Sequence, residues 1–495
     1  MLAWTIYLSF LGAAMAALAP KDRPTIARWI ALTTSVLGLG IGLAGILHQT
    51  NRSALQTIVD VPWIPAIHAR YLLAADGISL TLVLLTGIAA VAGILFSWNI
   101  THRANQFFAF YLTLIGGVYG VFLSFDAFLF FVFYEIAIIP KYFLVAIWGS
   151  TNKEYGAMKL ALYSFVGSAL VLVGLIATYA HAGSPTFSLL ELARQPLPTS
   201  FQVWVFPLVF VGFAILAGLW PFHTWAPTGH VAAPTAASML LAGVVMKLGA
   251  YGALRVAMPL FPEGLAAWRD PLALLSVIGI LAGAGIALIQ KDFKFVVGYS
   301  SVSHMGFVLL GLMTLSVTGL SGAVLQMFSH GIIASLLFAV VGRMIYDRAH
   351  TRELSALESL QLSRALPFAA ITFVLASLAS MGLPGFSGFV AELQVLMGAW
   401  KTFPLYAALA GIGILIGVAY TLRVLVKAFF GQSNGTIEAA THENYAPISI
   451  PERIGALLLL GTSLLVGIYP RVLLDLILPS FETPLMKPLL KGAGL

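Results

Sequence analysis

The sequence contains no cysteine and very few charged residues for its length. Without cysteine, this chain has no disulfides, cysteine-ligated iron–sulfur clusters or zinc–thiolate sites. Only 9% of the 495 residues are charged, 60% are hydrophobic, and the mean hydropathy is +0.96. Soluble proteins are usually about 25% charged. The composition therefore predicts a membrane protein that crosses the bilayer many times, and it excludes a string of soluble domains.

Sequence signals for cofactors and nucleic acids are also missing. There is no Walker A motif, no Rossmann glycine fingerprint and no haem or zinc spacing. The net charge of +7 comes from lysines and arginines placed between apolar runs, so it does not indicate nucleic-acid binding. Pro20 and Lys21 follow the first apolar run where a cleavage site would be needed, so we expect no cleavable signal. We expect no cofactor, no metal, no nucleic-acid partner, and no direct binding of NADH or iron–sulfur clusters.

Apolar runs of membrane-spanning length occupy most of the chain. A spanning helix needs about 20 apolar residues, and we count about fourteen such runs. The long loop 48–71 is expected to form a small cap, and the polar loop 430–451 to lie on the surface. The expected spans are 3–19, 26–47, 72–97, 107–124, 126–148, 156–181, 203–221, 233–256, 270–289, 294–313, 319–345, 366–402 (broken), 404–429 and 452–478.

The loops on alternate sides of these spans differ in charge. The side that carries Lys21, Arg103 and Lys153 has more lysine and arginine than the other. By the positive-inside rule this side is cytoplasmic, which leaves both termini outside.

Two of the predicted spans are interrupted. The stretch 220–255 breaks at Pro221 and Pro227, places His223 and His230 in a polar loop, and continues into a second apolar helix. The stretch 381–394 reads MGLPGFSGFVAELQ and breaks around Pro384. One interrupted helix in each half of a transporter indicates an internal repeat with functional sites at the breaks. The spacing predicts two five-helix units, spans 4–8 (107–256) and spans 9–13 (270–429), after three N-terminal helices (1–100) and before a C-terminal helix and tail (452–495).

Two ionisable side chains are predicted deep in the membrane. Glu135 lies near the middle of the fifth span, and its helical neighbours three and four positions away are all apolar, so any partner must come from another helix. Lys141 is six positions further, which on a regular helix faces another direction. Lys247 lies near the middle of the eighth span. Either residue could be purely structural, but ionisable residues inside a membrane usually have a functional role.

A further set of ionisable residues accompanies them. His304 and His330 lie in the tenth and eleventh spans beside serine and glutamine, which can hold water or relay hydrogen bonds. A lone histidine is often an ordinary core residue, yet with Glu135 and Lys247 the two histidines are consistent with a proton relay. Glu392 follows the second break and is either a group reached by water or a helix cap. Lys159 is either a membrane-edge lysine or an entry-side group.

The chain resembles the M-type (chain 4) antiporter-like subunits of respiratory complex I, which are related to the Mrp antiporters. The resemblance implies fourteen helices, two inverted five-helix repeats, and proton translocation driven by quinone reduction in other subunits. It also implies that Glu135, Lys247, His304, His330 and Glu392 stand at the positions of the family's proton-carrying residues. The matching stretches are ADGISL (75–80), YEIAIIPKYFLVAIWG (134–149), PFHTWAP (221–227), APTAASMLLAGVVMKLGAYGALR (233–255), DFKFVVGYSSVSHMGFV (292–308), QMFSHGIIASLLF (326–338), GLPGFSGFVAELQVL (382–396) and GIYP (467–470).

The chain departs from this family at one charged position. The family has a lysine in the broken seventh helix that pairs with the glutamate of the fifth, and here the aligned residue is Leu216. Either Lys141 or Lys159 replaces the missing charge, or Glu135 rests neutral and cycles differently, or pumping is altered or lost. We favour retained translocation with a rearranged pair, because the other residues of the path are present.

The sequence therefore predicts a proton-translocating membrane subunit of an NADH–quinone oxidoreductase in a bacterial-type inner membrane, surrounded by lipid and by other membrane subunits. Protons would enter near Glu135 and Lys159, reach Lys247, pass via His304 and His330, and leave near Glu392. The alternatives are a cation/proton antiporter subunit, a membrane arm of a hydrogenase or carbon-dioxide-uptake complex, and a structural spacer that does not pump.

Overall fold

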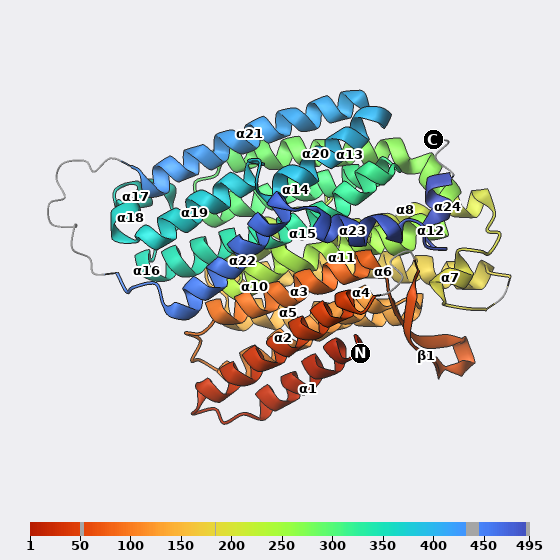
Figure 1. The fold of residues 1–495 in the computed structure, drawn as a ribbon, viewed down its shortest axis with the longest axis horizontal. Coiled ribbons are helices and arrows are strands. Elements are labelled where there is room, and N and C mark those ends of the chain that lie inside the picture. Colours follow the sequence, from red (N-terminus) through yellow and green to blue (C-terminus); the bar gives the residue numbers. More distant parts are fainter. Residues whose placement is uncertain (50–53, 184, 432–444, 492–495) are drawn as a thin grey trace.

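The protein is a bundle of long, roughly parallel helices (Figure 1). A computed structural model describes every residue except 50–53, 184, 432–444 and 492–495. Twelve helices among the described residues are long and apolar enough to cross a membrane. Trp4–Leu18 and Pro367–Ser380, the first predicted span and the first half of the twelfth, are shorter apolar helices. The prediction of a mainly helical, multi-pass membrane protein is confirmed. Most of the predicted surface loop 430–451 lies outside the described residues.

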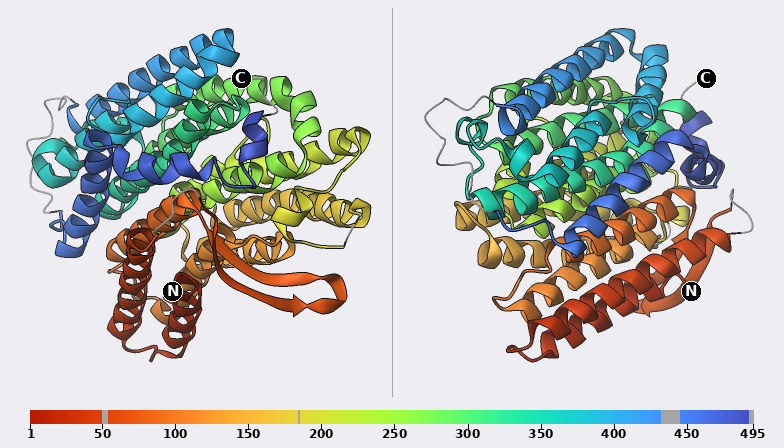
Figure 2. Two further views of the ribbon diagram at one scale, coloured as in Figure 1. Left: turned by 45° about the vertical axis from the view of Figure 1, so that its right-hand side comes forward. Right: turned by 60° about the vertical axis from the view of Figure 1, so that its left-hand side comes forward.

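The first half of the chain forms one edge and the middle of the bundle. Helices α1 and α2 lie at that edge, beside α3 and α4 (Figures 1 and 2). The helices are α1 (Trp4–Leu18), α2 (Pro24–Leu47), α3 (Gly77–Phe96), α4 (Ala104–Leu123), α5 (Ala127–Trp148), α6 (Lys153–His181), α7 (Leu189–Leu192), α8 (Thr199–Ala217) and α9 (Trp225–Ala232).

The eighth span is one continuous helix from Thr235 to Leu260 with two π-helical turns, and it is buried throughout. Such turns widen the helix locally and often occur at functional sites. Its parts are α10 (Thr235–Leu240), the π-turn η2 (Leu241–Val245), α11 (Met246–Gly252), the π-turn η3 (Ala253–Ala257) and α12 (Met258–Leu260).

The second half of the chain continues to the opposite edge of the bundle, where α21 lies (Figure 1). Its elements are α13 (Pro262–Ile289), α14 (Phe293–Met313), α15 (Val317–Ala339), the π-turn η4 (Val340–Tyr346), α16 (Asp347–Ala349), α17 (Leu354–Glu358), α18 (Leu362–Ala365), α19 (Pro367–Ser380), α20 (Ser387–Thr402), α21 (Pro404–Phe429), α22 (Ile450–Ile468), α23 (Arg471–Ser480) and α24 (Lys487–Lys491).

The predicted final span was wrong in extent. We expected one helix over 452–478, but α22 ends at Ile468 and a separate helix, α23, begins at Arg471. Pro470 lies between them, and because proline lacks an N–H group and its ring clashes with the preceding turn, it favours a helix end there. Only the first of these two helices has membrane-spanning length.

Both predicted helix breaks are present. The first lies between α8 and α9 and contains Gly218 with φ of +88°. The second lies between α19 and α20 and contains Gly382 and Gly385, with φ of +74° and +101°. These angles lie in the left-handed region that glycine adopts without strain. Pro227, however, does not break the helix. It lies in the first turn of α9, where the missing N–H group has no helical partner to lose.

The two halves share a local pattern at corresponding helices. Asp126 caps α5 and Asp292 caps α14, each by accepting hydrogen bonds from the next backbone N–H groups. Each aspartate also forms an isolated antiparallel bridge to the residue that precedes a short helix: Ser188 before α7 and Glu353 before α17. In the first half the short helix is followed directly by the broken helix, and in the second half a further short helix, α18, comes between them.

The predicted cap in loop 48–71 contains a β-hairpin. Strand β1 (Gln56–Ile64) pairs antiparallel with β2 (Ala69–Ala75), joined by the 3-10 turn η1 (Pro65–Ile67). The hairpin extends away from the helices (Figure 2) at the end of the bundle where the N-terminus and α24 also lie (Figure 1). Because β2 runs to Ala75, the third helix begins at Gly77 and not at residue 72 as predicted.

A buried ion pair joins the start of α3 to the end of the eighth span. Asp76 caps α3 by accepting from the backbone N–H of Ser79, and both its oxygens accept from the Arg255 guanidinium at 2.7 and 2.8 Å. Both side chains are fully buried, and the guanidinium also lies over the rings of Phe125 and Tyr251. The sequence places Arg255 at the end of a predicted span, where cations are usually exposed, but the structure buries it completely.

We predict that Asp76→Ala strongly destabilises the subunit. The substitution leaves the buried Arg255 guanidinium without its counter-charge, a change that costs about 3–5 kcal/mol in other proteins. Thermal denaturation of the purified complex and the amount of subunit incorporated should both fall. The matched control is Asp60→Ala, because Asp60 pairs with Arg70 at 2.7 Å on the exposed hairpin, where ion pairs contribute little. Equal stability of the two variants would contradict the prediction.

Candidate functional site

Lys247 lies inside the bundle, in the first turn of α11 and two residues after the π-turn η2 ends. Its side chain is completely buried. The ammonium nitrogen lies 2.7 Å from Nδ1 of His330 on α15, and it also donates to the backbone carbonyl of Ala242 within η2. An ammonium group has three donors and no acceptor, so the imidazole Nδ1 accepts here. Lys247 and His330, 83 positions apart in the sequence, are thus directly hydrogen-bonded.

The contact continues from His330 to the second helix break. The rings of His330 and His304 have centroids 5.4 Å apart, and Nδ1 of His304 lies 2.9 Å from Oε1 of Glu392. Gln326 donates from Nε2 to the same carboxylate oxygen at 3.1 Å, while Ser380 Oγ lies 3.3 Å from the other ring nitrogen of His304. Four of the six predicted residues therefore form one row: Lys247, His330, His304 and Glu392.

A small cavity separates the two histidines from the break between α19 and α20. It measures about 10 Å³ and is lined by both rings, Ser329, Ser380 and Glu392. This is roughly the space that one water molecule needs, and polar groups line it. The Glu392 carboxylate also lies close to the break itself, since a Cβ placed on Gly382 would be 3.3 Å from its Oε2. The row thus ends beside non-helical backbone.

Glu135 lies apart from this row. Its carboxyl group is partly buried and interacts with the Ser168 hydroxyl on α6 and with the ammonium of Lys141 on its own helix. Within the described part of the chain, one carboxylate oxygen of Glu135 and the buried ammonium of Lys141 have no hydrogen-bond partner. No hydrogen bond or ion pair joins the two groups among the described residues, so the expectation that they face different directions stays a prediction. Lys141 is nevertheless within electrostatic range of the Glu135 carboxyl, and its side chain is long and flexible.

Lys159 contacts groups other than Glu135 among the described residues. Its ammonium donates to Thr228 Oγ1 on α9 at 3.3 Å and lies over the ring of Tyr155. It therefore faces the first break. Leu216 is buried in the last turn of α8, so this position supplies no charge.

The sequence analysis missed the position of His230. We placed it in a polar loop, but it lies on α9 and is fully buried. Neither ring nitrogen has a hydrogen-bond partner among the described residues, and the ring lies within electrostatic range of Lys247 and Lys294. The signal for a helix was present, since Pro227 is three residues upstream and favours a first helical turn.

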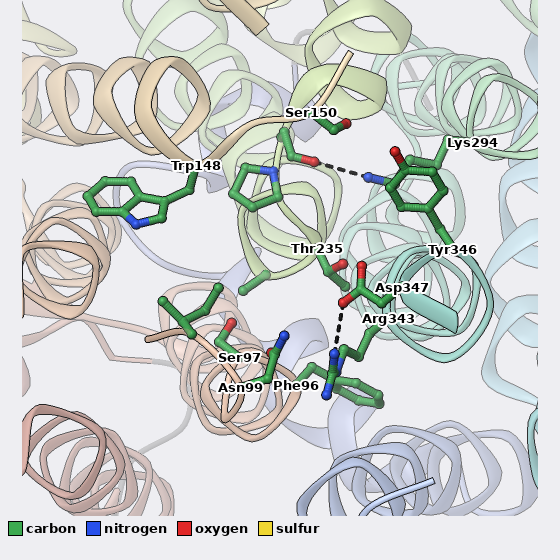
Figure 3. A pocket seen from close by; sticks show the side chains of 14 residues that line it. Phe96, Ser97, Asn99, Trp148, Ser150, Thr235, Lys294, Arg343, Tyr346 and Asp347 are labelled. Atoms are coloured by element: carbon green, nitrogen blue, oxygen red, sulfur yellow. Dashed lines mark hydrogen bonds and ion pairs between the residues drawn. The ribbon is translucent and has the colours of Figure 1, made fainter. Parts of the chain in front are cut away.

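A polar cavity opens near Lys294 (Figure 3). It has a volume of about 210 Å³ and lies among the ends of α3, α5, α10, α14 and the π-turn η4. The Lys294 ammonium donates to the carbonyl of Ala233 at 3.0 Å, and Arg343 pairs with Asp347 at 2.9 Å. Thr235 and Tyr346 add hydroxyl groups to the wall. Lys294 lies in the first turn of α14 and is buried.

Comparison with known proteins identifies relatives over the whole chain. The family model described as "NADH:quinone oxidoreductase/Mrp antiporter, TM" matches residues 124–417. The NADH-quinone oxidoreductase subunit M of Escherichia coli (strain K12) is 35% identical over 493 residues, 96% of each sequence. The subunit M of Rhodobacter capsulatus is 35% identical over 466 residues, covering 92% of this chain and 89% of that protein.

Solved structures agree with these sequence relatives. A chain of respiratory complex I from Thermus thermophilus superposes with a TM-score of 0.89 at 27% identity, covering all of both chains. A chain of the Mrp complex from Dietzia sp. DQ12-45-1b gives a TM-score of 0.85 over 99% of both chains, but at 20% identity it shows only a shared fold. The resemblance to M-type subunits is confirmed: the chain belongs to the NADH:quinone oxidoreductase/Mrp antiporter transmembrane family.

Proposed function

We propose that this chain is a proton-translocating membrane subunit of a complex I-type quinone oxidoreductase, with the redox chemistry in other subunits. The observation that carries the proposal is the buried row from Lys247 through His330 and His304 to Glu392, in which consecutive groups are bonded or separated by space for one water. The names of the relatives from Escherichia coli and Rhodobacter capsulatus support the same assignment.

Proton transfer along this row needs no large movement. The ammonium of Lys247 donates to Nδ1 of His330, and the proton on the far nitrogen of that ring can then leave. A water in the small cavity would take that proton and pass it to His304, whose Nδ1–H donates to the Glu392 carboxylate. Protonated Glu392 would release the proton beside the second break, where non-helical backbone can line water.

Protons would enter from the lysine- and arginine-rich side, which we propose is cytoplasmic. One entry is near Glu135 and Lys159, which faces the first break. The cavity at Lys294 is a second entrance on that side, and His230 lies within electrostatic range of both Lys294 and Lys247. We also propose that the chain lies in an inner membrane of bacterial type. The same charge asymmetry supports placing both termini of the chain on the outer side of that membrane.

The matched aspartate caps and bridges at α5 and α14 support an inverted repeat. If successive helices alternate in direction, α5 and α14 begin on opposite sides of the membrane. Each then leads to a short helix and a broken helix. We therefore propose the repeat boundaries 107–256 and 270–429, flanked by 1–100 and 452–495.

The partners proposed for this chain are the other membrane subunits of a complex I-type assembly. The Mrp neighbour keeps an antiporter subunit as the alternative, because it has the same fold. A membrane arm of a hydrogenase or carbon-dioxide-uptake complex would differ in its partners only. A structural spacer would need none of the row from Lys247 to Glu392.

We predict that Glu392→Gln slows proton translocation roughly tenfold, because His304 loses its proton acceptor. The effect is limited because water at the break offers a partial bypass. The measurement is proton flux per electron by the whole complex in vesicles, in sodium-free buffer and again with sodium added. The matched control is Glu263→Gln at an exposed position of α13. Unchanged flux for Glu392→Gln would favour the spacer, and flux that requires sodium would favour the antiporter.

A further inference from the structure

A long groove lies on the outer surface between α1, α4 and α5. It has a volume of about 490 Å³ and a mostly apolar wall. Small residues of α1, including Ala13, Ala14 and Ala17, form one side, and Phe110 and Phe143 form the other with stacked rings 5.0 Å apart. The groove is outside the proposed proton path.

The length of the groove matches one leaflet of a bilayer. Along α4 its wall runs from Arg103 to Thr113, ten residues that rise about 15 Å in a helix. The hydrocarbon core of a membrane is about 30 Å thick, so this is half of it. A transmembrane helix about 10 Å across would occupy roughly twice the groove's volume over the same length. A single acyl chain, in contrast, suits both the length and the volume of the groove.

Only one end of the groove is charged. Arg103 and Gln106 stand there, with Ala17 of α1 and Ile147 of α5 at the same level. Arg103 is exposed, donates to Gln106 Oε1 at 2.5 Å, and lies over the ring of Trp148. Because the Arg103 guanidinium has further free donors, it can bind a phosphate oxygen while keeping these contacts.

Other cations surround this end. Lys21 and Arg23 are exposed in the loop that follows α1, and Asn105 Nδ2 donates to the carbonyl of Ala17 at 3.2 Å, which holds α1 against the start of α4. Basic sites between helices at a membrane surface favour anionic lipid headgroups.

We propose that this groove binds an anionic phospholipid, with one acyl chain along α1, α4 and α5 and its phosphate on Arg103. Arg103 selects the headgroup by charge, and the alanine-lined wall of α1 provides the room for the chain. The lipid belongs to the leaflet on the lysine- and arginine-rich side.

The test uses the whole complex in phosphatidylcholine nanodiscs that contain a photoactivatable phosphatidylglycerol or the matching phosphatidylcholine. Cross-linked peptides are mapped by mass spectrometry. We expect phosphatidylglycerol to label residues 13–17 and 109–113 more strongly than phosphatidylcholine does. Arg103→Gln should reduce that labelling about fivefold. Ala14→Phe, which fills the groove, should reduce labelling by both lipids.

Two control variants match these substitutions. Arg23→Gln removes an exposed cation at the same membrane level, and Gly40→Phe adds bulk at an exposed position of α2 with open space around it. Neither should change labelling in the groove. Absence of labelling with either lipid would overturn the proposal by showing that another protein segment covers the groove. Equal labelling by both lipids would overturn the preference for an anionic headgroup, and labelling unaffected by Arg103→Gln would overturn the placement of the phosphate on Arg103.

Discussion

Replacing Lys247 with methionine should lower proton translocation by the assembled complex on the order of a hundredfold, within the range that positioned proton-transfer groups contribute. Methionine is similar in length and suits the apolar surroundings, so the helix should keep its packing. The substitution removes the ammonium that contacts Nδ1 of His330 and the carbonyl of Ala242. The row would then lose its first group, the one that delivers the proton to His330.

Lys247→Arg separates proton exchange from simple charge. Arginine keeps a positive charge at the site but cannot release its proton in a protein. If Lys247 acts by exchanging a proton, Lys247→Arg should be as inactive as Lys247→Met. If the lysine only supplies a fixed charge for packing, the arginine variant should retain translocation, and the proposed relay would be wrong.

The measurement is proton flux in vesicles together with quinone reduction by the same preparation. Lys401→Met is the matched control, because Lys401 is an exposed lysine at the end of α20. Equal amounts of assembled subunit in all variants would show that the loss is functional. Flux in Lys247→Met equal to that of the control would contradict the prediction.

Much of the site could be predicted because its signals are local. Proline and glycine mark a helix break, and an ionisable residue in an apolar run stands out; these signals identified Lys247, His304, His330 and Glu392. The geometry of the row could not be predicted, because residues far apart in sequence supply it. Lys247 and His330 are 83 positions apart, and His304 and Glu392 are 88 apart.

Errors arose where tertiary packing overrides local pattern. Arg255 has the sequence position of a cation at the end of a span, yet its partner Asp76 is 179 residues away and draws it inside. The β-hairpin was not predicted because both its strands carry polar and aromatic residues without clear alternation. Its register depends on cross-strand pairs such as Gln56 with Ala75.

The second prediction concerns the pair Glu135 and Lys141. Lys141→Met should slow proton translocation roughly a hundredfold, as Glu135→Gln should, because each removes one of two opposite charges that lie within electrostatic range of each other in a poorly solvated site. A structural spacer would tolerate both substitutions. Lys153→Met, a lysine at the membrane edge whose ammonium donates to the carbonyl of Ile147, is the matched control.

A rescue experiment tests whether Lys141 takes the place of the lysine that the family resemblance predicts at Leu216. Phe213 of α8 packs edge-on against Tyr134, the neighbour of Glu135, with ring centroids 5.6 Å apart. Position 216 lies one turn further on the same face of α8, so a lysine there would point toward α5. Leu216→Lys should therefore restore most of the proton flux to Lys141→Met and none to Glu135→Gln. Rescue of both variants, or of neither, would show that the requirement is not a counter-charge for Glu135, and the two lysine positions would then not be equivalent.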